Sequence, residues 1–350
     1  MKKSIMIVWV VVSLIAISCS KTDTSTSLKD SVEKSAAKIN NAISEISVTK
    51  GYELLTVSED LSKTEISYHD SITLAMIAGI YDYSPDTVFY HENPFPRKLF
   101  KKTGISDNMI VNMPQKLVLH PRYMHNFYET DSALANNFTI TATDYHFYYS
   151  WFHGYDYKLS AGLALDQEDI GSLEIASAAK RYNDFSYQSK YSFTEGYNIA
   201  VEFNTDDTTT SSFALCNGDQ VLLKESRVII KSKCPRDCER QYTLTIGNVD
   251  IVRSSEIDSI QVFLDGVLQQ KAAVKIIDES DTTGTICHHR DILLTFDDGT
   301  TVNLSELIGP ALETLRTLVD SLQSMYFAKN IIDYIALNIY YHEYKMPYHH

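Results

Sequence analysis

The N-terminal part of the chain carries hydrophobic residues at the spacing of an α-helix. An apolar residue recurs every three or four positions between polar ones: Leu28, Val32, Ala36, Ile39, Ile43 and Ile46. This one-sided stripe predicts an amphipathic helix over residues 28–48. We expect the helix to lie on its own domain. A coiled-coil stalk is the alternative, although about three heptads is the lower limit for that structure.

The C-terminal part begins with a second helical stripe. Pro310 is compatible with the first turn of a helix, and the apolar positions that follow predict a packed helix over roughly residues 306–326. We expect Lys329 and Asn330 to end this helix. Apolar and other residues then alternate over residues 335–340, which predicts a closing strand.

Between these helices the chain alternates in the manner of β-strands. Brief strands are predicted at residues 109–111 and 116–119, and longer ones from Phe138 onward. The turns Asp265-Gly266 and Asp297-Asp298-Gly299 lie between alternating runs and predict tight hairpins. Meanders of this kind form sandwiches or barrels. The predicted fold class is therefore mainly β (α+β), with antiparallel sandwich or barrel-like sheets, an N-terminal amphipathic helix and a packed C-terminal helix.

A weak internal similarity divides the β-rich part. Three short segments have counterparts about a hundred residues later, in the same order: 138–141 with 242–245, 156–159 with 258–261, and 197–204 with 290–297. A tandem duplication would explain this order, and two unrelated stretches of antiparallel sheet are the alternative. We divide the body into a first β-rich domain at 49–226 and a second at 227–350, which includes the C-terminal helix.

The beginning of the chain has the pattern of an export signal. Lys2 and Lys3 precede an apolar run that is too short to cross a bilayer of about 30 Å. The pattern predicts a cleaved signal peptide over residues 1–18, followed by a flexible tether at 19–27. Ala16 and Ser18 before Cys19 resemble a bacterial lipoprotein box, which implies that Cys19 is acylated. An ordinary signal peptide with an incidental cysteine is the alternative.

Charge limits the partners of the chain. It contains 31 Lys and Arg against 45 Asp and Glu, a formal net charge of −14. Loss of Lys2 and Lys3 with the signal would leave −16. This excess repels phosphate backbones, and no basic patch is present, so nucleic acid is not an expected partner. The charge also opposes binding to an anionic membrane surface, so the lipid is expected to make the membrane contact.

Four cysteines remain after Cys19, namely Cys216, Cys234, Cys238 and Cys287. Outside the cytoplasm an even number of cysteines permits disulfides, here in three connectivities. Cys234 and Cys238 together with Cys287-His288-His289 are the alternative, a zinc site, although their spacing differs from the usual zinc knuckle. We therefore predict disulfides and no metal or cofactor.

The segment 145–157 is dense in aromatic residues. On a strand, alternate side chains face opposite sides, so Tyr145, Phe147, Tyr149 and Trp151 are expected to fill a core. The other set would be exposed and could stack on sugar rings or on a partner protein. The predicted ligand contacts are Tyr148, Trp151, Phe152 and Tyr155. The alternative is a strand buried on both faces beneath a helix, for which the C-terminal helix is the candidate.

The chain contains no nucleophile elbow, zinc-protease helix, phosphate-binding glycine loop or dinucleotide fingerprint. The Ala16–Cys19 box, the polar Ser-Lys-Thr-Asp after it and the Tyr/Asp/Thr-rich β body resemble the outer-membrane or surface lipoproteins of Bacteroidetes, in members that have no assigned activity. The resemblance implies a protein of the cell envelope, anchored in the outer membrane and either periplasmic or surface-exposed.

The sequence therefore predicts a cell-envelope lipoprotein that acts as a binding or structural module, with glycans or peptides as ligands. One alternative is a secreted, glycosidase-like hydrolase with paired carboxylates, which has no short sequence signature. A second alternative is a zinc-stabilised envelope protein.

Overall fold

The fold is taken from a computed structural model of the chain. It describes residues 27–57, 70–84, 99–119, 135–150, 154–180, 184–206, 208–230, 238–255, 259–279, 289–320, 326–340 and 344.

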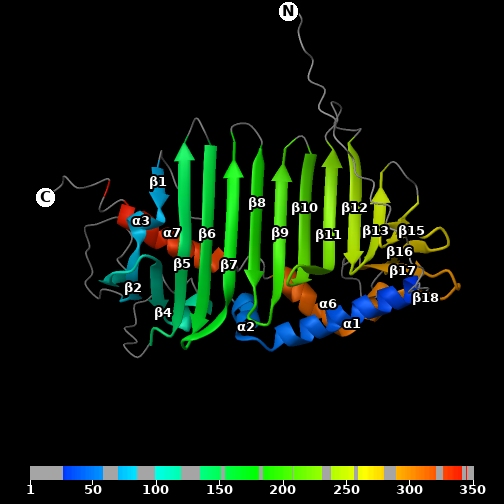
Figure 1. The fold of residues 1–350 in the computed structure, drawn as a ribbon, viewed down its shortest axis with the longest axis horizontal. Helices are drawn as coiled ribbons and strands as arrows, with labels where there is room; N and C mark the ends of the chain where they lie inside the picture. Colours follow the sequence, from blue (N-terminus) through cyan, green and yellow to red (C-terminus); the bar gives the residue numbers. More distant parts are fainter. Residues whose placement is uncertain are drawn as a thin grey trace, which may run out of the picture.

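Most of the described strands belong to one long sheet (Figure 1). Its order is β15-β14-β13-β12-β11-β10-β9-β8-β7-β6-β5-β4-β2-β3, and β1 also pairs with β5. Neighbours are antiparallel except β2 and β4. The strands before β9 are β1 Asp70–Thr73, β2 Gly79–Tyr83, β3 Phe100–Gly104, β4 Met109–Met113, β5 Phe138–Ser150, β6 Gly154–Leu165, β7 Glu168–Ala179 and β8 Phe185–Ser192. The remaining strands of this sheet are β9 Tyr197–Thr205, β10 Thr208–Asn217, β11 Gln220–Ile230, β12 Glu239–Ile246, β13 Val249–Ser254, β14 Gln261–Leu264 and β15 Val267–Leu268.

A small second sheet and a set of helices complete the fold. The small sheet has the order β16-β17-β18, with β16 Ala273–Glu279, β17 His289–Thr295 and β18 Thr301–Asn303. The helices are α1 Leu28–Ser47, α2 Lys50–Val57, α3 Leu74–Ile77, α4 Gln115–Leu119, α6 Leu304–Asp320 and α7 Tyr326–Tyr340. In Figure 1, α6 and α7 run across the back of the long sheet and α1 lies along α6. One large core joins α1, α2, α6 and α7 to this face of the sheet.

The mainly β class with an N-terminal and a C-terminal helix is confirmed. The strands continue as a single open sheet, because almost every strand pairs with the next one along the chain. The described strands do not repeat the arrangement that a tandem duplication predicts. Strands β5 and β6 are direct neighbours, but β13 separates their supposed counterparts β12 and β14, and the counterpart of β9 belongs to the small sheet. The predicted domain boundary at residues 226/227 falls inside β11, which pairs with a strand on each side, so the sheet does not divide there.

The N-terminal helix is confirmed as a helix packed on its own domain. All six residues of the predicted stripe are at most 4% exposed. The Ser27 side chain accepts a hydrogen bond from the Asp30 N–H at 3.1 Å, which is an N-terminal cap. The first two positions of the stripe, Leu28 and Val32, belong to a second, smaller hydrophobic cluster near the small sheet.

Two predicted strands are helices in the structure. Residues 116–119 belong to α4, where Pro114 precedes the first turn and its carbonyl accepts a hydrogen bond from the Leu117 N–H at 3.0 Å. The predicted closing strand is part of α7, and Lys329-Asn330 lies inside that helix. The buried apolar residues of α7 recur in adjacent pairs at a period of four, which buries one helix face: Phe327, Ala328, Ile331, Ile332, Ile335 and Ala336.

Both predicted hairpin turns are confirmed. Asp265 and Gly266 have φ angles of 50° and 76° between β14 and β15, as a two-residue turn with left-handed backbone requires. Gly299 has a φ of 80° in the turn between β17 and β18. The predicted strand at residues 109–111 is confirmed as part of β4. Residues 72–81 form an apolar run that fits either a helix or a strand by periodicity alone, and they contain strand, a short helix and strand.

Candidate functional site

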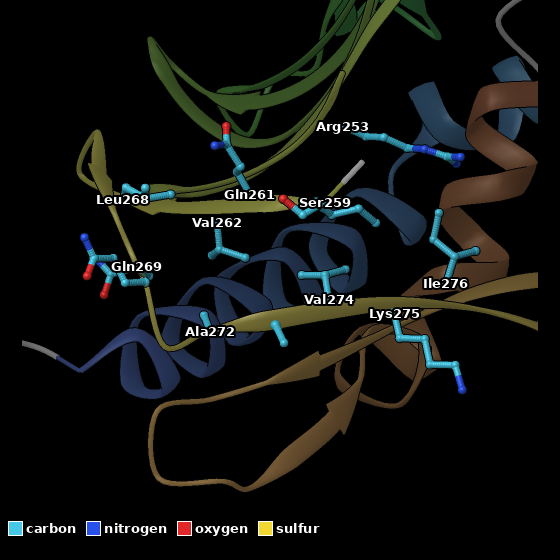
Figure 2. A pocket seen from close by; sticks show the side chains of 13 residues that line it. Arg253, Ser259, Gln261, Val262, Leu268, Gln269, Ala272, Val274, Lys275 and Ile276 are labelled. Carbon is cyan, nitrogen blue, oxygen red and sulfur yellow. The ribbon is translucent and has the colours of Figure 1, made fainter. Parts of the chain in front are cut away.

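The candidate site is a groove at the β15 end of the long sheet, where this sheet meets the small one (Figure 2). We call it the edge groove; it is lined by Arg253 and by residues 259–262, 268–270 and 272–276. Its volume is about 830 Å³. This is within the usual range for a site that encloses a small molecule or a short piece of a polymer.

The hairpin β14–β15 forms one wall of the edge groove. The Asp265-Gly266 turn reverses the chain, and the Gln269 N–H donates a hydrogen bond to the Val262 carbonyl at 2.8 Å. The chain then turns back at residues 269–272, where the Ala272 N–H donates to the Gln269 carbonyl at 3.2 Å, and enters β16. A short connection therefore places β16 opposite β14.

The smaller hydrophobic cluster fixes the two walls against each other. Val262 of β14 is 1% exposed and packs in this cluster with Leu28 and Val32 of α1, and Val274 of β16 is packed against it. In Figure 2, Val262 and Val274 extend from the two walls toward the gap between them, with α1 behind. The groove is thus formed by packed strands on a helix.

Polar and cationic side chains surround the groove. Arg253 and Lys275 are exposed, and neither has an ion-pair partner among the residues that the structure describes. Gln261, Gln269 and Gln270 add amide groups, and none of the described lining residues is Asp or Glu. In a chain with a net charge of −14, this is a local excess of positive charge. The lining therefore does not supply the carboxylate pair that the hydrolase alternative requires.

The predicted aromatic contacts do not come together in one site. In the pairing of β5 with β6, Tyr148 lies opposite Asp156 and Tyr149 lies opposite Tyr155. Tyr148 and Tyr155 therefore face opposite sides of the sheet. Trp151 and Phe152 lie outside the described residues. The predicted core residues Tyr145 and Phe147 are buried at 3% and 2% exposure, and Tyr149 packs against the core.

Tyr155 is a packing residue on the helix-covered face. Its ring stacks on that of Tyr157 with centroids 6.3 Å apart and meets Phe147 edge-on at 5.9 Å. Its phenolic oxygen accepts a hydrogen bond from the Ser177 hydroxyl at 3.2 Å. Burial raises the pKa of Tyr155 to about 12. These contacts occupy the side chain within the protein. Tyr148 is half-buried on the opposite face.

A buried polar cluster connects α7 to the aromatic strands. The hydroxyls of Tyr145 and Tyr157 donate hydrogen bonds to Asp333 Oδ1 at 3.0 and 3.1 Å. Lys329 Nζ lies 2.5 Å from Asp333 Oδ2 and 4.5 Å from the centroid of the Tyr157 ring. Burial raises the pKa of both tyrosines well above its ordinary value, and the Asp333 charge adds to this. The tyrosines are therefore neutral donors that hold the carboxylate, which we interpret as structural support.

The predicted cysteine sites lie only partly within the described residues. Cys216 on β10 is a free thiol in the structure, and burial raises its pKa. Cys238 lies at the start of the segment that contains β12. Cys19, Cys234 and Cys287 lie outside the described residues, so acylation and the pairing of the other cysteines stay predictions. Among the residues described, no three His, Cys, Asp or Glu side chains are grouped in a way that could hold a metal ion.

Comparison with protein-family models, with curated proteins and with solved structures found no match for this chain. Within the described part of the chain, no helix has the length and apolar character needed to cross a bilayer.

Sequence reasoning missed the edge groove. The Asp265-Gly266 turn and the short strands beside it are predictable from the sequence, but they do not show that β16 lies opposite β14. The two cations come from separate strands, with Arg253 in β13 and Lys275 in β16, and neither belongs to a sequence motif.

Proposed function

We propose that the protein is a lipid-anchored binding module of the cell envelope, with its ligand in the edge groove. The observation that carries this proposal is the groove itself. It has a volume of about 830 Å³ and lies between two walls of strands, which pack on a hydrophobic cluster. Its lining includes amide, guanidinium and ammonium groups from several elements. A concave site with a few directed polar groups on an apolar base is typical of ligand recognition.

The composition of the lining supports binding rather than hydrolysis at this place. Arg253, Lys275 and the three glutamines donate hydrogen bonds, and Ile260 and Leu268 add apolar surface. The side chains that glycoside hydrolysis uses as acid, base or nucleophile are carboxylates, and the described lining has none.

The proposed location in the cell envelope depends on the lipoprotein box, and it is tested first. Cells that express the full chain are grown with labelled palmitate, and the mass of the mature N-terminus is measured. We expect label on the wild-type chain, a modified N-terminus at Cys19 and loss of both in Cys19→Ser. An unlabelled chain that still begins at Met1 would remove the anchor from the proposal.

Binding in the groove is tested with a tryptophan that fills it. The protein without its signal is applied to a glycan array and to a displayed peptide library, and the affinities of the hits are measured for variants. Ala273→Trp enlarges a residue that lines the groove, whereas Gln188→Trp on the open face of β8 is the matched control. We expect Ala273→Trp to weaken the hits by at least about tenfold and the control to leave them unchanged.

Two results would contradict the assignment of the groove. One is the absence of hits in both screens, and the other is a set of hits that Ala273→Trp leaves intact. In the second case, if Trp151→Ala abolishes binding of the hits, the binding site would be assigned to the aromatic segment 145–157.

A further inference from the structure

The edge groove is lined by strand edges rather than by one face of a sheet. Residues 259–262 line it consecutively along one wall, and residues 272–276 line it consecutively along the other. Alternate residues of a strand point to opposite faces, so a feature that touches every residue of a run lies at the edge. The edge presents the backbone N–H and C=O groups that point away from the strand's own partner.

Strand β16 offers the longer of the two edges. Within the described residues it pairs with β17 on one side and has no strand on the other. It contains seven residues. On the opposite wall, β15 already covers Phe263 and Leu264 of β14, which leaves the backbone near Gln261 open toward the groove. An added strand would therefore find more unpaired backbone groups on β16 than on β14.

The charge beside this edge selects an acidic occupant. Arg253 and Lys275 are exposed, and the described residues contain no counter-ion for either one. Another free edge of the same protein is a poor match, because β3 carries the exposed Lys101 and Lys102. Pairing β3 of a second copy with β16 would bring cations together, which costs free energy.

We propose that the occupant is an extended peptide with acidic side chains, which adds to β16 as a further antiparallel or parallel strand. This inference rests on the proposed function and specifies its ligand class. Main-chain hydrogen bonds to β16 would supply the attachment, as in other cases of strand addition. Acidic side chains on the Lys275 face of the added strand would reach this ammonium group, and aliphatic ones on the other face would contact Ile260 and Ile276.

The main-chain part is tested with a seven-residue peptide in which glutamate alternates with valine, labelled for fluorescence anisotropy. Two further versions carry N-methyl groups on alternate backbone amides, one set in each version. Only one set of amides points to β16. We expect methylation of that set to weaken binding on the order of a hundredfold and methylation of the other set to have less than about a tenth of this effect.

The side-chain part is tested by exchanging charges. A peptide with lysine in place of glutamate should bind at least about tenfold more weakly to the wild-type protein. The double variant Arg253→Glu/Lys275→Glu should reverse the preference. Lys190→Glu on the open face of β8 is the matched control and should keep the wild-type preference. Circular dichroism confirms that each variant is folded.

Three outcomes would overturn the peptide inference and leave the groove as a binding site. They are binding of an acidic oligosaccharide but of no acidic peptide, peptide binding that neither methylated version weakens, and dimerisation of the protein that Ala273→Trp abolishes. Loss of all binding by Ala273→Trp together with a difference between the methylated peptides supports both proposals. Hits that do not depend on the groove remove both.

Discussion

The two ends of the long sheet are stabilised in different ways. At the end near β5 and β6, α7 covers one face, and large buried side chains such as Phe138, Phe147 and Tyr157 belong to the main core. At the β15 end, a separate cluster of six buried residues holds β13, β14, β17 and α1 together. The covered end therefore belongs to the larger of the two hydrophobic cores. The other end leaves strand edges accessible, and binding regions commonly come from such less stabilised parts.

Matched leucine substitutions give the largest expected difference between the ends. Leu163 in β6 and Leu294 in β17 are 1% and 2% exposed. Leu163→Ala should lower the free energy of unfolding by about 4 kcal/mol, because a large core collapses little around a cavity. Leu294→Ala should cost about 2–3 kcal/mol, because the small cluster can relax. Urea denaturation of both variants measures this, and equal costs would show that the ends do not differ.

Removing the carboxylate beneath α7 should have the next largest effect. Asp333→Leu leaves the Lys329 ammonium without its partner and two tyrosine hydroxyls without their acceptor. We expect a loss of about 3 kcal/mol in the free energy of unfolding. The double variant Asp333→Leu/Lys329→Met should recover most of this loss. A double variant as unstable as the single one would show that the ion pair is not the cause.

High pH should weaken the covered end through its buried tyrosines. Burial raises the pKa of Tyr155 from 10.0 to about 12, and the pKa values of Tyr145 and Tyr157 are also raised. The unfolded chain therefore releases phenolic protons first. Stability is unaffected below pH 10 and falls as the pH rises from 10 to about 12. Tyr155 alone should contribute about 2 kcal/mol of this fall.

Thermal melts across this pH range, compared with those of Tyr155→Phe, check the contribution of Tyr155. The variant lacks this phenol, so its melting temperature should decline less. An equally steep decline would mean that Tyr155 ionises no later in the folded protein than in the unfolded chain.

The smallest effect on stability is expected at the rim of the edge groove. Lys275 is exposed and has no ion-pair partner among the described residues. Lys275→Glu should therefore change the free energy of unfolding by less than about 0.5 kcal/mol. Denaturation of this variant beside the wild type separates the proposed binding role of Lys275 from a structural one. A large loss would show that the side chain supports the fold.

Elements that bury one face on a regular period were predictable from the sequence. The stripe of α1 is an example, and so is the Asp265-Gly266 turn, where the backbone requirement is local. Helix α7 also buries one face, but Asp333 lies among its buried apolar residues and Lys329-Asn330 is typical of a helix end. An acidic residue such as Asp333 is expected to be exposed, but contacts with distant strands bury it here. Residues 335–340 happen to alternate as well, so the local pattern favoured a strand.

The candidate site was less predictable than the fold. The aromatic residues of 145–157 attracted attention, but the register of β5 and β6 places Tyr148 and Tyr155 on opposite faces. The edge groove depends on two sheets meeting, and this is a tertiary property of residues with no distinctive type.

The position of the first helix relates the groove to the proposed lipid anchor. Leu28, the first residue of α1, packs in the cluster that also holds Val262 and Val274, so the chain enters the fold beside the groove. Fully extended, residues 19–27 reach about 30 Å. If Cys19 carries the lipid as proposed, the length of this segment is no greater than the thickness of the hydrocarbon core of the bilayer. Capture would then take place in the shallow layer above the headgroups, and molecules confined to that same surface would meet the groove far more often than those in the bulk solvent.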